Sequence, residues 1–96
     1  MKINFNKSDD ALSVALDGRL DTVTAPEFES FLGENFDGKV SLVIDCEKLV
    51  YVSSAGLRVL LAAQKKAKAS MKLTNVCELV MDVFEMTGFA DILVIE

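Results

Sequence analysis

The chain has 96 residues, a net charge of −5 at neutral pH and a sequence pI near 4.6. This length is enough for a single domain, with one core spanning residues 1–96. The acidic balance argues against binding to nucleic acid or to an anionic membrane surface, because their phosphates would repel the protein. No apolar stretch approaches the ~20 residues that a membrane helix needs, and the N-terminus lacks the apolar core of a signal peptide. We therefore expect a cytoplasmic protein without membrane insertion.

The first third of the chain carries strand signals and then a helix signal. Apolar and polar residues alternate on both sides of the turn residues Ser8 to Asp10, which predicts a β-hairpin over residues 2–17. A helix is expected to begin at Thr24, which can act as the N-cap. Pro26 is tolerated in the first turn, and Glu27 would complete a capping box with Thr24.

The middle of the chain predicts a strand, a helix and a second strand. The run from Val40 to Ile44 is apolar and rich in β-branched residues, which is typical of a central strand covered on both faces. Apolar residues then recur at three- and four-residue steps from Gly56 to Ala67, the pattern of a packed helix. Met71 to Thr74 is a short strand.

The C-terminal part predicts one more helix and one more strand. Apolar residues repeat at helical spacing from Val76 to Phe84, and Gly88 follows where a left-handed C-cap belongs. Residues 92–95 are expected to form a last strand. The order β-β-α-β-α-β-α-β predicts one small α/β domain, a mixed sheet with helices packed on it.

The residue types that catalysis requires are mostly missing. The chain has no histidine, and Cys46 and Cys77 form no CxxC motif, which argues against a metal site and against a histidine-assisted nucleophile. A Walker loop and the Gly-x-Gly-x-x-Gly motif are also absent, so no cofactor is expected. Both cysteines lie beside apolar runs and are interpreted as small buried hydrophobic residues. We expect a binding module rather than an enzyme.

The segment Ser53-Ser54-Ala55-Gly56 lies between the central strand and the helix that follows it. Hydroxyls at a helix start are common N-caps, because they accept hydrogen bonds from free backbone N–H groups. These N–H groups and the helix dipole also favour negative charge, so a phosphate is tolerated there. Asp21, which precedes the first helix, is by itself interpreted as an exposed loop acid or an Asx-turn residue.

Three stretches resemble, in the right order, the STAS domain, in particular bacterial anti-sigma factor antagonists. They are Gly18 to Thr22 with Ala25, Val52 to Leu61 and Val80 to Phe89, so the resemblance extends in this order over nearly the whole chain. The resemblance implies a protein that binds an anti-sigma factor serine kinase of the histidine-kinase-like ATPase fold when unphosphorylated. Phosphorylation releases this partner, a PPM-type serine phosphatase reverses the change, and sigma factor availability is regulated in this way.

The resemblance also implies roles for individual residues. The serine two positions before the motif glycine, Ser54, corresponds to the phosphorylated residue. Relatives often carry an aspartate immediately before it, whereas this chain has Ser53, which leaves Ser53 open as the alternative phosphosite. Asp21 is implied to help the kinase engage the hydroxyl. The residues implied in partner binding are Asp21, Thr22, Ser53, Ala55, Gly56, Leu57 and Arg58.

Two other functions stay open. A constitutive STAS subunit of a lipid-transport complex or of a stressosome would bind its partner regardless of Ser54 phosphorylation. A nucleotide-binding domain is suggested by hydroxyls and amides at a helix start, but the missing Walker lysine and the acidic charge oppose it. Many relatives also continue into a terminal helix, whereas this sequence stops at Glu96, so we expect one sheet face to be less covered or to be covered by a partner or a second copy.

Overall fold

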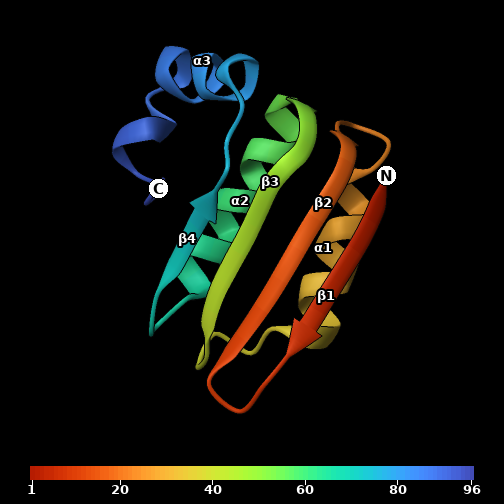
Figure 1. Cartoon of the computed structure of the whole chain (residues 1–96), viewed down its shortest axis with the longest axis vertical. Coiled ribbons are helices and arrows are strands. Elements are labelled where there is room, and N and C mark those ends of the chain that lie inside the picture. The colour runs from red at the N-terminus through yellow and green to blue at the C-terminus, as the bar shows by residue number, and fades with distance from the viewer.

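One mixed sheet of four strands runs through the molecule in the spatial order β1-β2-β3-β4 (Figure 1). The structure is a computed structural model that describes all 96 residues. The strands are β1 (Lys2–Lys7), β2 (Ala11–Leu20), β3 (Ser41–Val52) and β4 (Met71–Thr74). The helices are α1 (Ala25–Asn35), α2 (Ser54–Lys66) and α3 (Glu78–Thr87), followed by the short 3₁₀ helix η1 (Phe89–Asp91).

The connections between the strands explain where the chain changes direction. β1 and β2 form the predicted antiparallel hairpin, whereas β2 pairs with β3, and β3 with β4, in parallel. Helices α1 and α2 make the two crossovers and lie on the same face of the sheet, behind it in Figure 1. The three parallel strands end at one edge, so the segments that follow them gather there. The fold class and the order of elements agree with the prediction.

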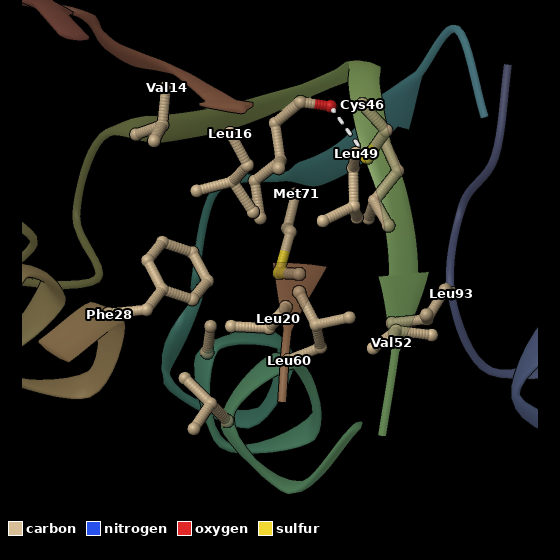
Figure 2. Packing of buried hydrophobic residues seen from close by; sticks show 14 of the residues in the cluster. Val14, Leu16, Leu20, Phe28, Cys46, Leu49, Val52, Leu60, Met71 and Leu93 are labelled. Carbon is tan, nitrogen blue, oxygen red and sulfur yellow. Dashed lines mark hydrogen bonds between the residues drawn. The ribbon is translucent and has the colours of Figure 1, made fainter. Parts of the chain in front are cut away.

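Side chains on one face of the sheet form the core together with α1 and α2. In β3, Leu42, Ile44 and Cys46 are buried, whereas Val43 is only half-buried because it points to the opposite face. Apolar side chains of both helices, including Phe28, fill the space next to these residues (Figure 2). The interpretation of this strand as covered on both faces is therefore wrong, since α1 and α2 pack on the same side.

The C-terminal elements follow the prediction with one change. α3 ends at Gly88 in the left-handed conformation, with φ 81° and ψ 0°, which confirms the predicted cap. Residues 92–95 were predicted to form a strand, but only Ile95 pairs with the sheet, in a single parallel bridge to Leu73. Leu73 makes two backbone hydrogen bonds of 2.9 Å to the residues on either side of Ile95. The strand is this short because the N–H groups of Ile92 and Leu93 donate to the carbonyl oxygen of Phe89, at 3.0 and 2.8 Å, and so continue the turn of η1.

Candidate functional site

The ends of β2 and β3 meet at the sheet edge that carries the serine motif. Leu20, the last residue of β2, pairs with Val52, the last residue of β3. The backbone N–H of Ser53 donates a hydrogen bond of 2.9 Å to the carbonyl oxygen of Leu20. This bond holds the loop that begins at Asp21 beside the first turn of α2. Two segments that are distant in sequence therefore form one surface.

Ser53 is the N-cap of α2. Its backbone is extended, with φ −99° and ψ 174°, and its Oγ accepts a hydrogen bond of 3.4 Å from the N–H of Gly56. Its carbonyl oxygen accepts the first helical hydrogen bond, from the N–H of Leu57, at 2.9 Å. The interpretation of a serine as helix cap is therefore confirmed for Ser53, whose side chain is engaged in the fold.

Ser54 is the first residue of α2, and its environment differs from that of Ser53. Its side chain is exposed, and its hydroxyl makes no hydrogen bond within the chain. It lies at the positive end of the helix dipole, close to backbone N–H groups that have no helical partner. Its hydroxyl is accessible without disturbing the fold, whereas modification of Ser53 would remove the cap.

Gly56 allows α2 to start directly against the sheet. A β carbon at this position would lie 2.7 Å from Cγ and 2.8 Å from the carbonyl oxygen of Leu20, which is closer than side chains approach in folded proteins. Gly56 is buried, and Leu57 is only 5% exposed. Gly56 and Leu57, which were predicted to contact a partner, are therefore core residues. They can influence partner binding only by positioning the first turn of α2.

Asp21 organises the loop between β2 and α1. Its Oδ1 accepts hydrogen bonds from the N–H groups of Val23, at 3.0 Å, and Thr24, at 3.1 Å. The Thr24 N–H is the main reason why the pKa of Asp21 lies below its ordinary value, and the Val23 N–H, the Thr24 hydroxyl and Arg19 lower it further. The interpretation of Asp21 as an Asx-turn residue is therefore confirmed.

Thr24 does not form the predicted capping box. Its hydroxyl donates to the carbonyl oxygen of Arg19 at 2.7 Å and accepts from the N–H of Asp21 at 2.8 Å. Its backbone is already helical, with φ −93° and ψ −19°, and its side chain caps no N–H of α1. The capping-box prediction is wrong because this hydroxyl closes the preceding loop, so Glu27 has no cap to complete.

A shallow hollow of about 230 Å³ lies between the first turns of α1 and α2. It brings together three of the predicted contact residues. Arg58 is exposed and forms no ion pair, so its guanidinium group is free. Glu29, on α1, was missed by the sequence reasoning, because only the packing of α1 beside α2 places it here. The lining residues are Thr22, Ala25, Pro26, Glu29, Ala55, Arg58 and Val59.

Arg19 is a second residue that the sequence reasoning missed. Its guanidinium carbon lies 4.2 Å from the centre of the Tyr51 ring, and its Nε lies 3.6 Å from Oδ2 of Asp21. Arg19 therefore links the end of β3 to the loop through a cation–π contact and a weak ion pair. The sequence carried no clear signal for this role, because the contact depends on the pairing of Arg19 in β2 with Tyr51 in β3.

The cysteines are free and belong to the packing. Cys46 is buried, and burial raises the pKa of its thiol to about 12. Cys77 is half-buried, and its S–H donates to the carbonyl oxygen of Leu49 at 3.5 Å. The structure contains no group of three or more His, Cys, Asp or Glu side chains placed to hold a metal ion. None of its helices combines the length and the apolar character needed to cross a membrane.

Comparison with known proteins relates this fold and site to one family. The STAS domain family model matches residues 2–96. The chain is 36% identical over 96 residues to BtrV of Bordetella bronchiseptica, a protein named as an anti-sigma factor antagonist, and the match covers 96% of this chain and 83% of BtrV.

Two solved structures share the fold. An anti-sigma factor antagonist from Mycobacterium paratuberculosis has a TM-score of 0.86 at 24% identity, with 98% of this chain and 83% of that chain covered. The anti-sigma factor antagonist SpoIIAA of Bacillus, in its unphosphorylated form, has a TM-score of 0.83 at 18% identity, with 99% and 88% covered. The family model spans almost every residue, and the chain belongs to the STAS domain family.

Proposed function

We propose that the protein is an anti-sigma factor antagonist that works by partner switching. In the unphosphorylated state, the surface formed by the Asp21 loop and the first turn of α2 binds an anti-sigma factor serine kinase, which frees the sigma factor. Phosphorylation of Ser54 by this kinase ends the complex. The observation that carries the proposal is the difference between two adjacent serines: the Ser54 hydroxyl is exposed and unbonded, whereas the Ser53 hydroxyl caps α2.

Phosphorylation of Ser54 is expected to change binding and to leave the fold intact. It adds about −1.5 to −2 charges at neutral pH, at a helix end that favours negative charge. Arg58 lies four residues further along α2, on the same face as Ser54, and its guanidinium group is free to pair with the phosphate. Both interactions stabilise the modified domain when it is alone.

The same phosphate opposes a docked complex. A partner seated on the first turn of α2 would have to desolvate the phosphate and would lose Arg58 as a contact. Burying a charged group without a matching partner costs several kcal/mol, roughly enough to dissociate a complex of ordinary affinity. The phosphate therefore acts on the interface, and the hydrophobic core under α2 is unaffected.

The remaining residues of the surface have separate roles in this proposal. Thr22, Ala55 and Arg58 line the hollow and are available to a partner. Asp21 keeps the loop in shape through its bonds to Val23 and Thr24, and in this proposal it helps the kinase engage the Ser54 hydroxyl.

The names of relatives support the class of partner. BtrV and SpoIIAA are both called anti-sigma factor antagonists, and SpoIIAA is known in an unphosphorylated and a phosphorylated form. In our proposal the kinase has the histidine-kinase-like ATPase fold, a PPM-type phosphatase reverses the modification, and the cycle runs in the cytoplasm, where sigma factors act. The protein itself binds and does not catalyse.

The test combines phosphosite mapping with binding to the anti-sigma factor kinase of the same organism. Mass spectrometry of the protein after incubation with kinase and ATP should find one phosphate, on Ser54. Ser54→Asp should weaken kinase binding by about tenfold or more, with unchanged thermal unfolding. Ser13→Asp is the matched control, since Ser13 is exposed on the sheet face opposite α1 and α2.

Two results would contradict the proposal. Equal binding of Ser54→Asp and the unchanged chain, with no phosphate found, would favour a constitutive subunit of another complex. A phosphate on Ser53 would move the switch to the capping residue, and its addition would then lower the stability of α2.

A further inference from the structure

The whole net charge of the protein lies in its C-terminal quarter. Residues 1–74 contain ten Lys or Arg and ten Asp or Glu, whereas residues 75–96 contain five Asp or Glu and no Lys or Arg. All five are exposed, and one of them pairs with Lys72, at 3.3 Å. Three belong to α3. The five are Glu78, Asp82, Glu85, Asp91 and Glu96.

The same helix also exposes apolar side chains. Val80 and Phe84 of α3 are buried in the core, which uses one face of the helix. Leu79 and Met86 are 59% and 87% exposed, and the half-buried Val83 lies between them at helical spacing. The apolar arc of α3 is therefore wider than the face that it buries. We call Leu79, Val83 and Met86, with their acidic neighbours Glu78, Asp82 and Glu85, the α3 surface.

We propose that the α3 surface is a docking site for a basic amphipathic segment of another protein. Apolar side chains of such a segment would cover Leu79 and Met86, and its Lys or Arg residues would pair with the carboxylates beside them. The negative charge of α3 favours a basic segment over other possible partners. A second copy of the chain would bring like charges together, and nucleic acid or an anionic membrane would be repelled.

The location of α3 makes this site an extension of the edge that carries Ser54. β3 and β4 are parallel, so α2 and α3, which follow them, begin at the same end of the sheet (Figure 1). The S–H of Cys77, the cap residue of α3, donates to the carbonyl oxygen of Leu49 and holds the start of α3 against β3. The inference rests on α3 itself and does not require the Ser54 switch.

The test is an NMR titration of the full ¹⁵N-labelled chain with a synthetic helical peptide of Leu and Lys, with the Lys residues on one face. We expect saturable shift changes confined to residues 76–96, and about tenfold weaker binding when the salt concentration is raised from low to moderate. The double variant Leu79→Ser, Met86→Ser should lose this binding. Val23→Ser is the matched control, since Val23 is 84% exposed elsewhere and should leave binding unchanged.

Several outcomes would overturn the inference. They are the absence of saturable binding, shift changes centred on the acidic turn at Asp9 and Asp10, or equal binding by the double variant with native thermal unfolding. A peptide with Glu in place of Lys that binds equally well would remove the electrostatic argument. Self-association of the chain through α3 would assign the surface to a second copy. No anti-sigma factor is present in this assay, so its failure is distinguishable from failure of the proposed function.

Discussion

The carbonyl oxygen of Leu20 lies against Gly56, so closely that a β carbon on residue 56 would be 2.8 Å away from it. The same oxygen accepts the hydrogen bond from the N–H of Ser53. One atom at the end of β2 therefore positions the cap of α2 and excludes a side chain three residues later. The exposed position of Ser54 follows from this contact, because the helix can begin only where residue 56 fits against the strand.

Replacing Gly56 with Ala is expected to destabilise the domain by about 1–3 kcal/mol, because the added methyl group overpacks the contact with Leu20 and Val52. Gly33→Ala in α1 is the matched control. A β carbon there meets nothing within 4 Å, so stability should stay equal or rise by up to about 1 kcal/mol. Urea unfolding measures both. Equal stability of Gly56→Ala and the unchanged chain would show that α2 can shift without cost.

Removing the hydroxyl of Ser53 should lower the stability of the protein more than removing the hydroxyl of Ser54. Ser53→Ala removes the cap of α2 and should lower the free energy of unfolding by about 0.5–2 kcal/mol. Ser54→Ala removes an exposed, unbonded hydroxyl and should change it by less than about 0.5 kcal/mol. Thermal or urea unfolding of the two variants provides the comparison. A larger loss for Ser54→Ala would make Ser54 the structural serine and Ser53 the better phosphosite.

The carboxyl group of Asp21 should titrate below 3.8, because the N–H of Thr24 and the other donors of the loop favour its ionised form. Because the pKa of Asp21 is lower in the folded state, its carboxylate stabilises the fold at pH values above the ordinary pKa of 3.8. This contribution is lost as the pH falls through the folded pKa. Carboxyl ¹³C NMR can follow the titration. Thr24→Val, which removes the hydroxyl donor, should raise the pKa, whereas a midpoint at or above 3.8 in the unchanged chain would contradict the observed bonds.

Cys46 should stay unmodified in the native protein at pH 8, because its pKa of about 12 leaves almost no reactive thiolate. Titration with a thiol reagent should label only Cys77, and Cys46 should react after unfolding. Burial favours the neutral thiol of Cys46 over the thiolate. The folded state with a neutral Cys46 therefore keeps its full stability below pH 9.0, the ordinary pKa of a thiol, and loses stability as the pH rises towards 12. In the Cys77→Ser variant, fast labelling of Cys46 in the folded protein would mean that β3 opens near Cys46.

Local patterns were sufficient for most of the elements and for the start of α2. Alternation over residues 2–17 predicted the hairpin, and helical spacing before Gly88 predicted α3 with its left-handed cap. The hydroxyls at Ser53 and Ser54 marked the start of α2. These features depend on residues within a few positions of one another, and the sequence contains such neighbours directly.

Other features depend on contacts between distant parts of the chain. The hydroxyl of Thr24 bonds to Arg19 and Asp21 in a loop whose geometry depends on the end of β2, so the predicted capping box fails. β3 is buried on one face only, because both crossover helices pack on the same side. The last strand is reduced to one bridge at Leu73, because the N–H groups of Ile92 and Leu93 donate to the carbonyl oxygen of Phe89 and so continue the turn of η1.

The sequence by itself determined that this protein is a small STAS-like α/β domain with a serine motif at a helix start. It did not determine which serine is free, because a capping hydroxyl and a free hydroxyl are the same residue type one position apart. Only the tertiary structure decided this: Leu20 and Gly56 set the first turn of α2, Ser53 bonds to that turn, and Ser54 faces solvent. The physical reason is that the partners of Ser53 include a strand end more than thirty residues away, at Leu20, which the fold alone brings into contact.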